Sequence, residues 1–528
     1  MSTITIPGIL ILKGNKTYGR MQTTDFKNVK TVNLKDNKTN LKEGKLLYKV
    51  ILNNKTHCLI PYEIKQLGFS KVLDNLYVLI SNENKLIETI GPVSSNEAFY
   101  EYQLHCHGLK QSSTLFKNKI MKSLKNYKDD GPIEEINRLY NLEQRIDLSW
   151  YIFSIDPEGS TDFDDAFSIK KLDNENLLLS IYIANVPIWL DWLSNANPDI
   201  NLDDLNKIST IYLPPALSCK PFGQDLPHTK HPMLPNILSD DLCSLWAKKK
   251  RVAFTLDLEI DKDYNIIKTS FCNTLISLRK NWTYDDPHLV LNEHYIRLLN
   301  CVNKMNKKEL INDSHKLVEY LMIEMNCICG KILFDNNKQA IYREAKDIKS
   351  VTEEINIDTF EINKILRKIK ACYTKQITDL PISHDMLEKE SYIHITSPIR
   401  RLVDILNMIS MEKLFGLITF SDKINDFFNR WFQDEQIIHI NEISKKIKSV
   451  QNKCNLLHLI TNNYIPETIL EGYVIDETTF YIPEYKLQCK IRKSDTIEYK
   501  IYSKYKCKLY LFEESDSLNR KIRVDIII

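Results

Sequence analysis

The sequence predicts a multidomain α+β protein, and two observations carry that prediction. Short β-rich apolar runs occur near both ends of the chain, while helical periodicity dominates its middle. The 528 residues correspond to about three to four domains at about 150 residues each. Apolar residues make up 43% of the chain and charged residues 27%, which is ordinary for a globular protein with a sizeable core.

The first 95 residues are predicted to form a small β-barrel or sandwich. Two β-rich apolar runs, Ile4–Lys13 and Lys45–Asn53, alternate with polar stretches such as Lys35–Thr39 that are typical of loops. Helical spacing begins near Ser94 and continues to about Leu142. We therefore expect helices to follow the first β-rich region.

The middle of the chain combines strands with long helices. Alternating patterns predict strands at Tyr151–Ile155 and Leu177–Ile183. Helical periodicity predicts helices over Ser314–Phe334, Ile399–Leu417 and Asp434–Asn463. The last of these carries an apolar stripe that we expect to pack on the core, made of Ile437, Ile440, Ile443 and Ile447.

Charge and cysteine usage exclude several classes of protein. The 71 Lys and Arg against 69 Asp and Glu give a net charge of +2, which argues against a polybasic coat or an acidic tail but leaves local patches open. The 12 cysteines form no CxxC pair, so reduced thiols are expected. Met1–Gly14 lacks a secretory signal, and no apolar run reaches the roughly 18 residues of a membrane span. We expect a cytoplasmic protein without a membrane partner, with a nuclear or viral-particle location left open.

Four aspartates fall within ten positions: Asp156, Asp162, Asp164 and Asp165. A proline and a glycine after the first favour a turn there, and a turn beyond Asp165 would bring most of the carboxylates together. Such a cluster is unfavourable without a counter-ion, and hard oxygen ligands suit Mg²⁺ or Mn²⁺. A metal pair held in this way activates water and stabilises the leaving oxygen of a phosphodiester. The residues alone leave an acidic surface turn equally open.

The sequence Thr-Ser-Pro-Ile-Arg-Arg forms a second group of candidate residues. Ser397 suits a helix N-cap and Pro398 the first helical position, which would place Arg400 and Arg401 in the first turn. Basic residues are unfavourable there because of the helix dipole, and a phosphate bound at the helix N-terminus would explain them. A surface salt bridge, for example from Arg400 to Asp404, is the alternative that the residues leave open.

Taken together, these segments resemble the ribonuclease II/ribonuclease R family, which includes the processive catalytic subunit of the exosome. The family pattern Ile-Asp-Pro, four residues, Asp-x-Asp-Asp-Ala is matched by residues 155–166, and the motif Thr-Ser-Pro-Ile-Arg-Arg by residues 396–401. Further blocks agree in the same order, at residues 145–148, 182–186, 209–214, 232–245, 283–285 and 317–326. The resemblance implies that the acidic cluster is a catalytic metal site.

The resemblance implies a processive 3′→5′ exoribonuclease that hydrolyses single-stranded RNA to nucleoside 5′-monophosphates by two-metal chemistry in a narrow channel. The implied metal ligands are Asp156, Asp162 and Asp165, with Asp164 most directly involved in cleavage, and Arg400 holding the scissile phosphate. The implied cofactor is Mg²⁺, with Mn²⁺ as an alternative. We expect a monomer that binds RNA with a free 3′ end, and a larger RNA-processing assembly is left open.

Other family positions imply contacts to RNA. Tyr284 matches a tyrosine that packs against the terminal nucleotide, and Tyr212 matches one that stacks farther up the strand. Glu319 matches a glutamate near the 3′-terminal ribose, which suits a reader of the 2′-hydroxyl. Arg401, beside Arg400, is a further candidate for RNA binding. Stacking contributes about 1–3 kcal/mol per base and tolerates any sequence.

The two ends of the chain resemble the barrels that flank this family's catalytic domain. The region from Gly8 to about Gly91 resembles a cold-shock barrel, and the C-terminal segment looks like a diverged S1 barrel with interleaved basic and aromatic residues. Lys490, Arg492 and Tyr502 are its candidate RNA contacts, with a solvated strand face as the alternative. The predicted domains are an OB-like cold-shock barrel region over 1–95, a helical connector over 96–145, an RNB catalytic domain of mixed sheet and long helices over 146–464, and an S1-like barrel over 465–528.

The sequence also departs from the family pattern. The stretch between Tyr284 and Glu319 is much shorter than in typical members and lacks an aromatic that clamps bases, which leaves product length and processivity open. Tyr182 and Asn185 replace the usual His and Asp of the second strand. A catalytically degenerate RNB-fold protein that binds RNA or acts as a scaffold is the alternative function. Retention of all four aspartates and Arg400 favours the enzyme.

Overall fold

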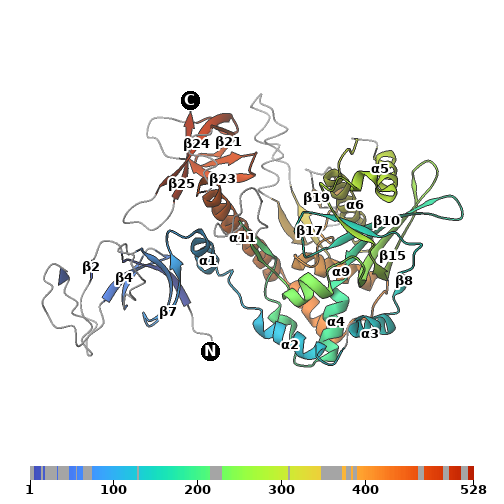
Figure 1. Cartoon of the computed structure of the whole chain (residues 1–528), viewed down its shortest axis with the longest axis horizontal. Helices are drawn as coiled ribbons and strands as arrows, with labels where there is room; N and C mark the ends of the chain where they lie inside the picture. Colours follow the sequence, from blue (N-terminus) through green and yellow to red (C-terminus); the bar gives the residue numbers. More distant parts are fainter. Residues whose placement is uncertain are drawn as a thin grey trace. The chain divides into compact units, whose positions relative to one another are not determined.

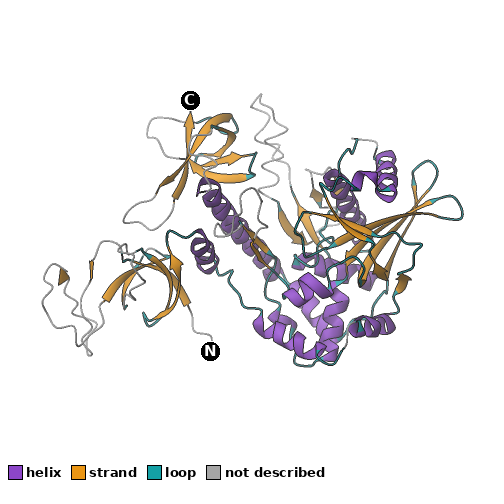
Figure 2. Ribbon diagram, viewed as in Figure 1, coloured by secondary structure: helices purple, strands orange, loops and turns teal. Residues whose placement is uncertain are grey.

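Two compact units divide the chain in the computed structural model (Figures 1 and 2). Residues 1–111, 212–229 and 446–528 form what we call the barrel unit, and residues 112–211 and 230–445 form the sheet unit. The mixture of sheets and long helices confirms the predicted α+β class, while the predicted four-part domain division stays a prediction. The structure describes residues 5–12, 16–17, 32–33, 47–54, 56–62, 74–127, 130–214, 229–306, 310–345, 371–375, 382–384, 389–461, 469–491, 499–512 and 521–527.

The N-terminal part of the barrel unit is an antiparallel five-stranded sheet with the order β5-β4-β1-β6-β7. Both apolar runs predicted as strands are confirmed, because they become β1 and β4, whereas the loop predicted at Lys35–Thr39 lies outside the described residues. The helix α1 (Asn96–Cys106) follows this sheet. The strands are β1 (Thr5–Leu10), β2 (Lys16–Thr17), β3 (Val32–Asn33), β4 (Leu47–Leu52), β5 (His57–Pro61), β6 (Leu76–Ser81) and β7 (Leu86–Pro92), with β2 and β3 paired to each other.

The C-terminal part of the barrel unit is a closed barrel with the strand order β21-β22-β23-β25-β24. Apolar side chains fill it, and Leu456 of α11 (Asp434–Thr461) packs against this core. Gly472 is required for closure, because a Cβ at this position would lie 2.3 Å from the carbonyl oxygen of Tyr481. The barrel confirms the expected OB-like architecture, and its strands are β21 (Leu470–Asp476), β22 (Thr479–Ile482), β23 (Leu487–Ile491), β24 (Lys504–Phe512) and β25 (Lys521–Ile527).

A seven-stranded mixed sheet organises the sheet unit, in the order β16-β9-β10-β11-β14-β15-β8. The outermost pairs, β16 with β9 and β8 with β15, are parallel, and the inner pairs are antiparallel. Both predicted strands of this region are confirmed, as β9 and β11. The strands are β8 (Glu143–Arg145), β9 (Phe153–Asp156), β10 (Asp165–Lys171), β11 (Leu177–Ala184), β14 (Lys250–Ile260), β15 (Ile266–Ser277) and β16 (Lys280–Thr283).

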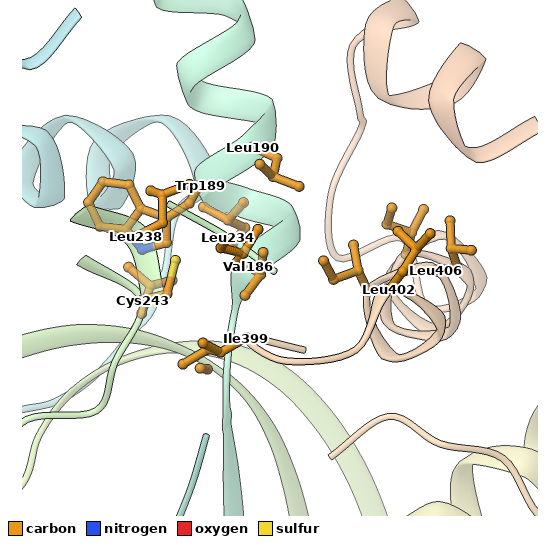
Figure 3. Packing of buried hydrophobic residues seen from close by; sticks show 14 of the residues in the cluster. Val186, Trp189, Leu190, Leu234, Leu238, Cys243, Ile399, Leu402 and Leu406 are labelled. Carbon is orange, nitrogen blue, oxygen red and sulfur yellow. The ribbon is translucent and has the colours of Figure 1, made fainter. Parts of the chain in front are cut away.

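Both faces of this sheet are buried. Successive strand residues point to opposite faces, so Ala166 and Tyr182 join one core cluster while Phe167 and Ile181 join the other. The first cluster contains α4 (Val186–Ala196) and α9 (Leu402–Leu414), and the α4 side chains Val186 and Trp189 lie beside the segment 234–243 (Figure 3). The second contains α5 and α6. Helices on both sides therefore fix the sheet, and with it the ends of its central strands.

The helices of the sheet unit connect or cover this sheet. The predicted helix at Ser314–Phe334 is confirmed as α6, and the predicted helix at Asp434–Asn463 is confirmed as α11, whose Ile437 and Ile440 are buried in the first core cluster. No helix in the described part of the chain is long and apolar enough to span a membrane. The bounds are α2 (Thr114–Leu124), α3 (Gly131–Tyr140), α4 (Val186–Ala196), a π-helical turn at Ile237–Leu242, α5 (Glu293–Met305), α6 (Ser314–Asp335), α9 (Leu402–Leu414) and α10 (Asp422–Trp431).

Shorter elements complete the sheet unit and its junctions with the barrel unit. Strands β12 (Ile211–Leu213) and β13 (Thr229–His231) lie where the chain passes from one unit to the other. The remaining elements are the 3-10 helices at Leu202–Asp204 and Leu289–Leu291, the paired strands β17 (Ile341–Glu344) and β18 (Cys372–Lys375), and the paired strands β19 (Ser383–His384) and β20 (Lys389–Glu390).

The predicted start of the helix at Ile399–Leu417 is wrong by one turn. Residues 398–400 form a turn, Arg401 holds the N-cap position, and α9 begins at Leu402. The reason is that distant carboxylates bind the amides that would open the helix. The Ser397 amide donates to Asp404 Oδ1 at 2.7 Å, and the Ile399 amide donates to Asp164 Oδ1 at 2.9 Å.

Both departures from the family pattern in the second strand belong to buried polar networks. The hydroxyl of Tyr182 accepts from Arg145 Nη1 at 3.3 Å, and Arg145 pairs with Asp257 through Nη1 and Nη2 at 2.9 and 2.5 Å. Asn185 caps α4 and donates its Nδ2 to Glu412 Oε1 at 2.7 Å. Burial raises the pKa of the Glu412 carboxyl to about 8. The two substitutions therefore support the sheet rather than a site on its edge.

Substitution of Glu412 by Gln should change how stability depends on pH. Glu412 is protonated in the folded protein at neutral pH, so its contribution is fully present below the unfolded pKa of about 4.3 and is lost as the pH rises through about 8. Glutamine has no proton to lose. Since one pKa unit corresponds to about 1.4 kcal/mol, the Tm of Glu412→Gln relative to wild type should rise by several degrees between pH 5 and pH 9 in scanning calorimetry.

The exposed Glu442 of α11 offers a matched control. Glu442→Gln should keep a constant Tm difference from wild type over the same pH range. A constant difference for Glu412→Gln as well would show that the buried carboxyl is already ionised in the folded protein.

Candidate active site

The four aspartates lie where two adjacent strands of the sheet meet. Asp156 ends β9 and Asp165 begins β10, and these neighbouring strands are antiparallel. The connecting loop carries Asp162 and Asp164. Gly159 has a positive φ of 78° in this loop, which confirms the predicted turn after Asp156. The fold thus gathers the carboxylates at one end of β9 and β10.

Burial makes this cluster electrostatically costly. Asp164 is 2% exposed and Asp165 is 8% exposed. Desolvation and the neighbouring carboxylates raise the pKa of Asp156 to about 7 and that of Asp165 to about 8. Desolvation is also the largest reason that the pKa of Asp164 rises to about 8, although Arg400 opposes it. A cation close to a buried carboxylate stabilises its charged form.

The donor set fits a hard divalent cation. The buried Oδ2 atoms of Asp156 and Asp165 have no hydrogen-bond partner among the described residues, and carboxylate oxygens are the ligands that Mg²⁺ and Mn²⁺ prefer. Within the described ranges, no three His, Cys, Asp or Glu side chains already surround one point as a ligand set. Cationic side chains contact the other two carboxylates of the cluster instead.

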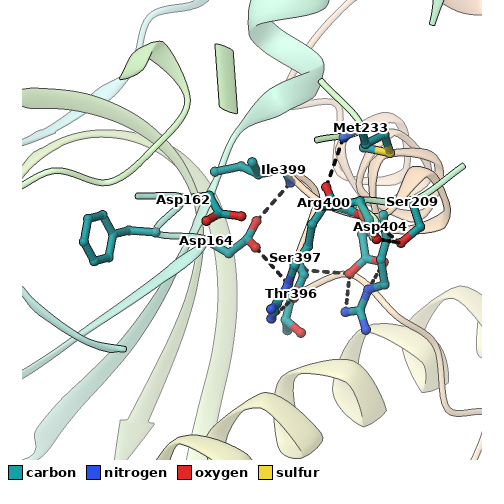
Figure 4. Close-up of polar contacts among 12 residues, drawn as sticks. Asp162, Asp164, Ser209, Met233, Thr396, Ser397, Ile399, Arg400 and Asp404 are labelled. Atoms are coloured by element: carbon teal, nitrogen blue, oxygen red, sulfur yellow. Dashed lines mark hydrogen bonds and ion pairs between the residues drawn. The ribbon is translucent and has the colours of Figure 1, made fainter. Parts of the chain in front are cut away.

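Arg400 is the first of these cations. Its Nε lies 3.2 Å from Asp164 Oδ2, and its Nη2 donates to Ser397 Oγ at 3.0 Å (Figure 4). The same carboxylate accepts the Ile399 amide through Oδ1. Asp164 therefore holds the turn and its arginine together. The Arg400 side chain is still 46% exposed, so solvent reaches part of it.

Arg401 has a different environment from its neighbour. Its Nε and Nη2 donate to Asp404 Oδ2 and Oδ1 at 2.8 and 2.7 Å, and Asp404 is completely buried. The salt bridge considered from the sequence thus forms, but from Arg401 rather than from Arg400. This fork positions the turn, and the RNA-binding role of Arg401 stays a prediction.

Tyr284 lies beside the aspartates. It follows β16, the parallel neighbour of β9, and its amide donates to the carbonyl oxygen of Asp156 at 3.1 Å. Burial is the main reason that its hydroxyl pKa is raised, and Asp165 and Asp156 add to that rise. The predicted contact residue is therefore brought to the acidic cluster.

The start of α6 meets Tyr284. The His315 ring stacks on the Tyr284 ring, with centroids 3.8 Å apart and planes 12° apart. Ser314 Oγ donates to the Tyr284 carbonyl oxygen at 2.9 Å. Glu319 is one turn farther along α6 and exposed. His315 was missed by sequence reasoning, although its i, i+4 spacing from Glu319 is a signal that could have found it.

The remaining predicted RNA contacts belong to the barrel unit or lie outside the described residues. Tyr212 is half-buried, and its carbonyl oxygen accepts from Gln451 Nε2 at 3.1 Å. Lys490 Nζ donates to Thr478 Oγ1 at 2.9 Å. Tyr502 takes a positive φ of 64°, and Arg492 is not among the described residues. Their roles stay predictions.

Lys230 is the second cation at the cluster, and sequence reasoning missed it. Its Nζ lies 3.1 Å from Asp162 Oδ1 and 2.6 Å from Asp240 Oδ1. Neither Lys230 nor Asp240 has a spacing that distinguishes it from other charged residues of the chain. Only the folded chain places them beside Asp162.

Comparisons with known proteins identify a matching domain and several similar proteins. The RNB domain profile matches residues 222–296 and 291–415. Exosome complex exonuclease RRP44 of Mus musculus is 21% identical over 485 residues, covering 73% of this chain and 49% of the relative. Ribonuclease R of Mycoplasmopsis pulmonis is 26% identical over 351 residues, covering 52% of this chain and 45% of the relative. The chain spans about half the length of the curated relatives it matches.

Solved structures share the fold. Mycoplasma genitalium RNase R in complex with ribose-methylated single-stranded RNA has a TM-score of 0.65 at 18% identity, covering 100% of this chain and 90% of that chain. Yeast Ssd1, a pseudonuclease, has a TM-score of 0.52 at 12% identity, covering 93% of this chain and 65% of that chain. Both likenesses concern the fold alone. Residues 222–415 match the RNB domain, and the chain is similar in sequence to curated relatives named ribonuclease R and exosome complex exonuclease RRP44.

Proposed function

We propose that this protein is a metal-dependent, processive 3′→5′ exoribonuclease that hydrolyses single-stranded RNA to nucleoside 5′-monophosphates. The observation that carries the proposal is the convergence of four aspartates beside Arg400 and Tyr284, with two buried carboxylate oxygens left without hydrogen-bond partners among the described residues. We further propose that it acts as a monomer in the cytoplasm, on RNA with a free 3′ end.

The carboxylates and the guanidinium have different roles at the scissile phosphate. Asp156, Asp162 and Asp165 would hold Mg²⁺ or Mn²⁺, and such ions activate water and stabilise a leaving oxygen. Arg400 would bind the scissile phosphate, because its side chain is partly exposed and a guanidinium suits phosphate oxygens. Asp164 keeps that guanidinium in place and, as the carboxylate nearest to it, lies closest to the bond that breaks.

Residues from two elements, Tyr284 after β16 and His315 of α6, would contact the terminal nucleotide. Tyr284 offers an aromatic ring for base or ribose packing, and His315 stacked on it holds the ring in one orientation. Stacking of this kind contributes about 1–3 kcal/mol per base without sequence preference. Glu319 accepts a hydrogen bond from the 2′-hydroxyl, the group that separates RNA from DNA.

A catalytically degenerate RNB-fold protein is the second candidate function. One observation favours it: no ligand set for a metal is arranged among the described residues, and Lys230 and Arg400 contact Asp162 and Asp164. Such a protein would bind single-stranded RNA and release no nucleotides. The experiment that follows separates the two candidates.

Substitution of Asp164 by Asn should abolish nucleotide release while RNA binding survives. Asparagine can still accept the Ile399 amide but carries no charge to hold Arg400, so the loss should exceed about 100-fold. The assay is a timed digestion of one 5′-labelled single-stranded RNA with and without Mg²⁺ or Mn²⁺, resolved by length, with binding measured by anisotropy.

The exposed Asp263→Asn in the turn between β14 and β15 is the matched control and should digest RNA at the wild-type rate. If the wild-type protein releases no mononucleotides or short products under any Mg²⁺ or Mn²⁺ condition, the enzyme proposal is rejected and the scaffold remains.

Substitution of Glu319 by Gln should weaken the preference for a ribose at the 3′ end. The uncharged amide is a poorer acceptor for the 2′-hydroxyl, and hydrogen bonds to charged groups contribute about 1.5–3 kcal/mol. The ratio of kcat/KM for an all-RNA strand to that for the same strand with a 3′-terminal deoxynucleotide should fall about tenfold or more. An unchanged ratio would remove the proposed contact.

The short connection between Tyr284 and Glu319 should lengthen the final products. The described residues of this connection form a 3-10 turn at Leu289–Leu291, α5 and the start of α6. A connection of this length would offer fewer surfaces to retain a short RNA. End products should be longer, or dissociation more frequent, than for Mycoplasma genitalium ribonuclease R assayed on the same labelled strand. Processive digestion to equally short ends would contradict this.

A further inference from the structure

Lys230 places an ammonium group at the acidic cluster, and none of the steps above uses it. Its Nζ lies 3.1 Å from Asp162 Oδ1, 2.6 Å from Asp240 Oδ1 and 2.8 Å from Thr161 Oγ1. The side chain is only 16% exposed. A lysine ammonium has three protons to donate, and these three acceptors use all of them.

Two of the three acceptors are held in place by the fold. Asp240 belongs to the π-helical turn, where its Oδ1 also accepts from Ser239 Oγ at 2.8 Å and its carbonyl oxygen accepts from Trp246 Nε1 at 2.7 Å. The carbonyl oxygen of Thr161 accepts from Ser244 Oγ at 2.9 Å. Contacts outside the four-aspartate cluster therefore hold Asp240 and Thr161, and these two residues hold the ammonium of Lys230.

Asp162 has a different status from the other two acceptors. It is one of the three carboxylates assigned above to the divalent ion, and its Oδ1 is the atom that Lys230 contacts. A cation that shares a carboxylate with a second cation weakens the binding of both, because the two positive charges repel at short range. When Asp162 turns to a divalent ion, Lys230 keeps Asp240 and Thr161.

We propose that Lys230 is an internal counter-cation that competes with the divalent ion for Asp162, and that Asp240 sets the strength of this competition by holding the ammonium. Lys230 is thus a positioning residue that determines how much metal the site requires. The inference rests on the proposed function of the cluster as a metal site. It adds a pair of residues, Lys230 and Asp240, whose effects on metal binding have opposite signs.

The test is a Mn²⁺ titration of the full chain without RNA, followed by electron paramagnetic resonance of the free ion. Lys230→Met removes the competing charge and should lower the Kd for Mn²⁺ about threefold to tenfold. Asp240→Asn removes the stronger partner of Lys230, so the ammonium relies more on Asp162 and the Kd should rise. In the double variant the Asp240→Asn effect should disappear, because no ammonium remains to be redirected.

Two controls make the titration specific. Lys230→Arg keeps the charge and should stay within about twofold of the wild-type Kd. Asp156→Asn with Asp165→Asn should abolish binding, so that the free-ion signal rises in proportion to the added Mn²⁺, which assigns the titrated ion to this cluster. A thermal melt of each variant shows whether the fold is retained. If Lys230→Met fails to fold, Asp240→Asn still tests the expected direction of the change in the Kd for Mn²⁺.

The outcomes separate this inference from the proposed function. Wild-type protein that binds Mn²⁺ at the cluster, with an unchanged or weaker affinity in Lys230→Met, overturns the inference alone and leaves Lys230 as a structural link between two loops. A Kd that does not rise in Asp240→Asn overturns it as well. Wild-type protein that binds no Mn²⁺ at the cluster overturns the inference and the proposed metal site together.

Discussion

Negative charge concentrated at one end of β9 and β10 is the constraint on which the rest of the site depends. Buried carboxylates that approach one another must be protonated or paired with cations. Here Arg400 contacts Asp164 and Lys230 contacts Asp162, whereas Asp156 and Asp165 each retain a buried oxygen without a hydrogen-bond partner among the described residues. Among the described residues, Lys230 and Arg400 thus contact two of the four carboxylates, and a divalent ion would balance the charge of the other two.

The same carboxylates also shape the backbone around them. Asp164 and Asp404 take the amides of Ile399 and Ser397, and this delays the start of α9 to Leu402. The delayed start places Arg400 in a turn, outside the helix, where the helix dipole no longer disfavours it. Arg401 is then available for Asp404. Two adjacent arginines therefore acquire different environments, one internal and one facing the cluster.

Whether the sequence could predict a feature of the fold depends on how far apart in the sequence the interacting residues lie. The turn after Asp156 and the strands β9 and β11 follow from local residue types, and the structure confirms them. The start of α9 could not be predicted from its own residues, because the Ile399 amide binds a carboxylate 235 positions away. Helix-capping rules consider only residues close in sequence, such as Ser397 and Pro398, and so they do not detect this contact.

In the candidate site, too, local motifs could be predicted from the sequence, whereas contacts between residues distant in sequence could not. The family motifs identify the four aspartates and Arg400, because those motifs are contiguous in the sequence. Lys230 lies 68 positions from Asp162, and Tyr284 and His315 come from separate elements. Nothing in the local pattern of Lys230 marks it as a partner of Asp162, and the contact of His315 with Tyr284 joins two elements that are separate in the sequence. Only the two buried faces of the sheet, which fix where its strands end, bring such residues together.

Charge balance also bears on the order in which ligands reach the site. Among the described residues, Asp162 and Asp240 contact the ammonium of Lys230, and Asp164 contacts the guanidinium of Arg400. Asp156 and Asp165 would add negative charge to this region when they are ionised, and negative charge at close range repels a phosphate. On the proposed function, a divalent ion held by these carboxylates would offset that repulsion, so its binding would precede or accompany that of the scissile phosphate. Arg400 would then contact a phosphate whose approach is favourable.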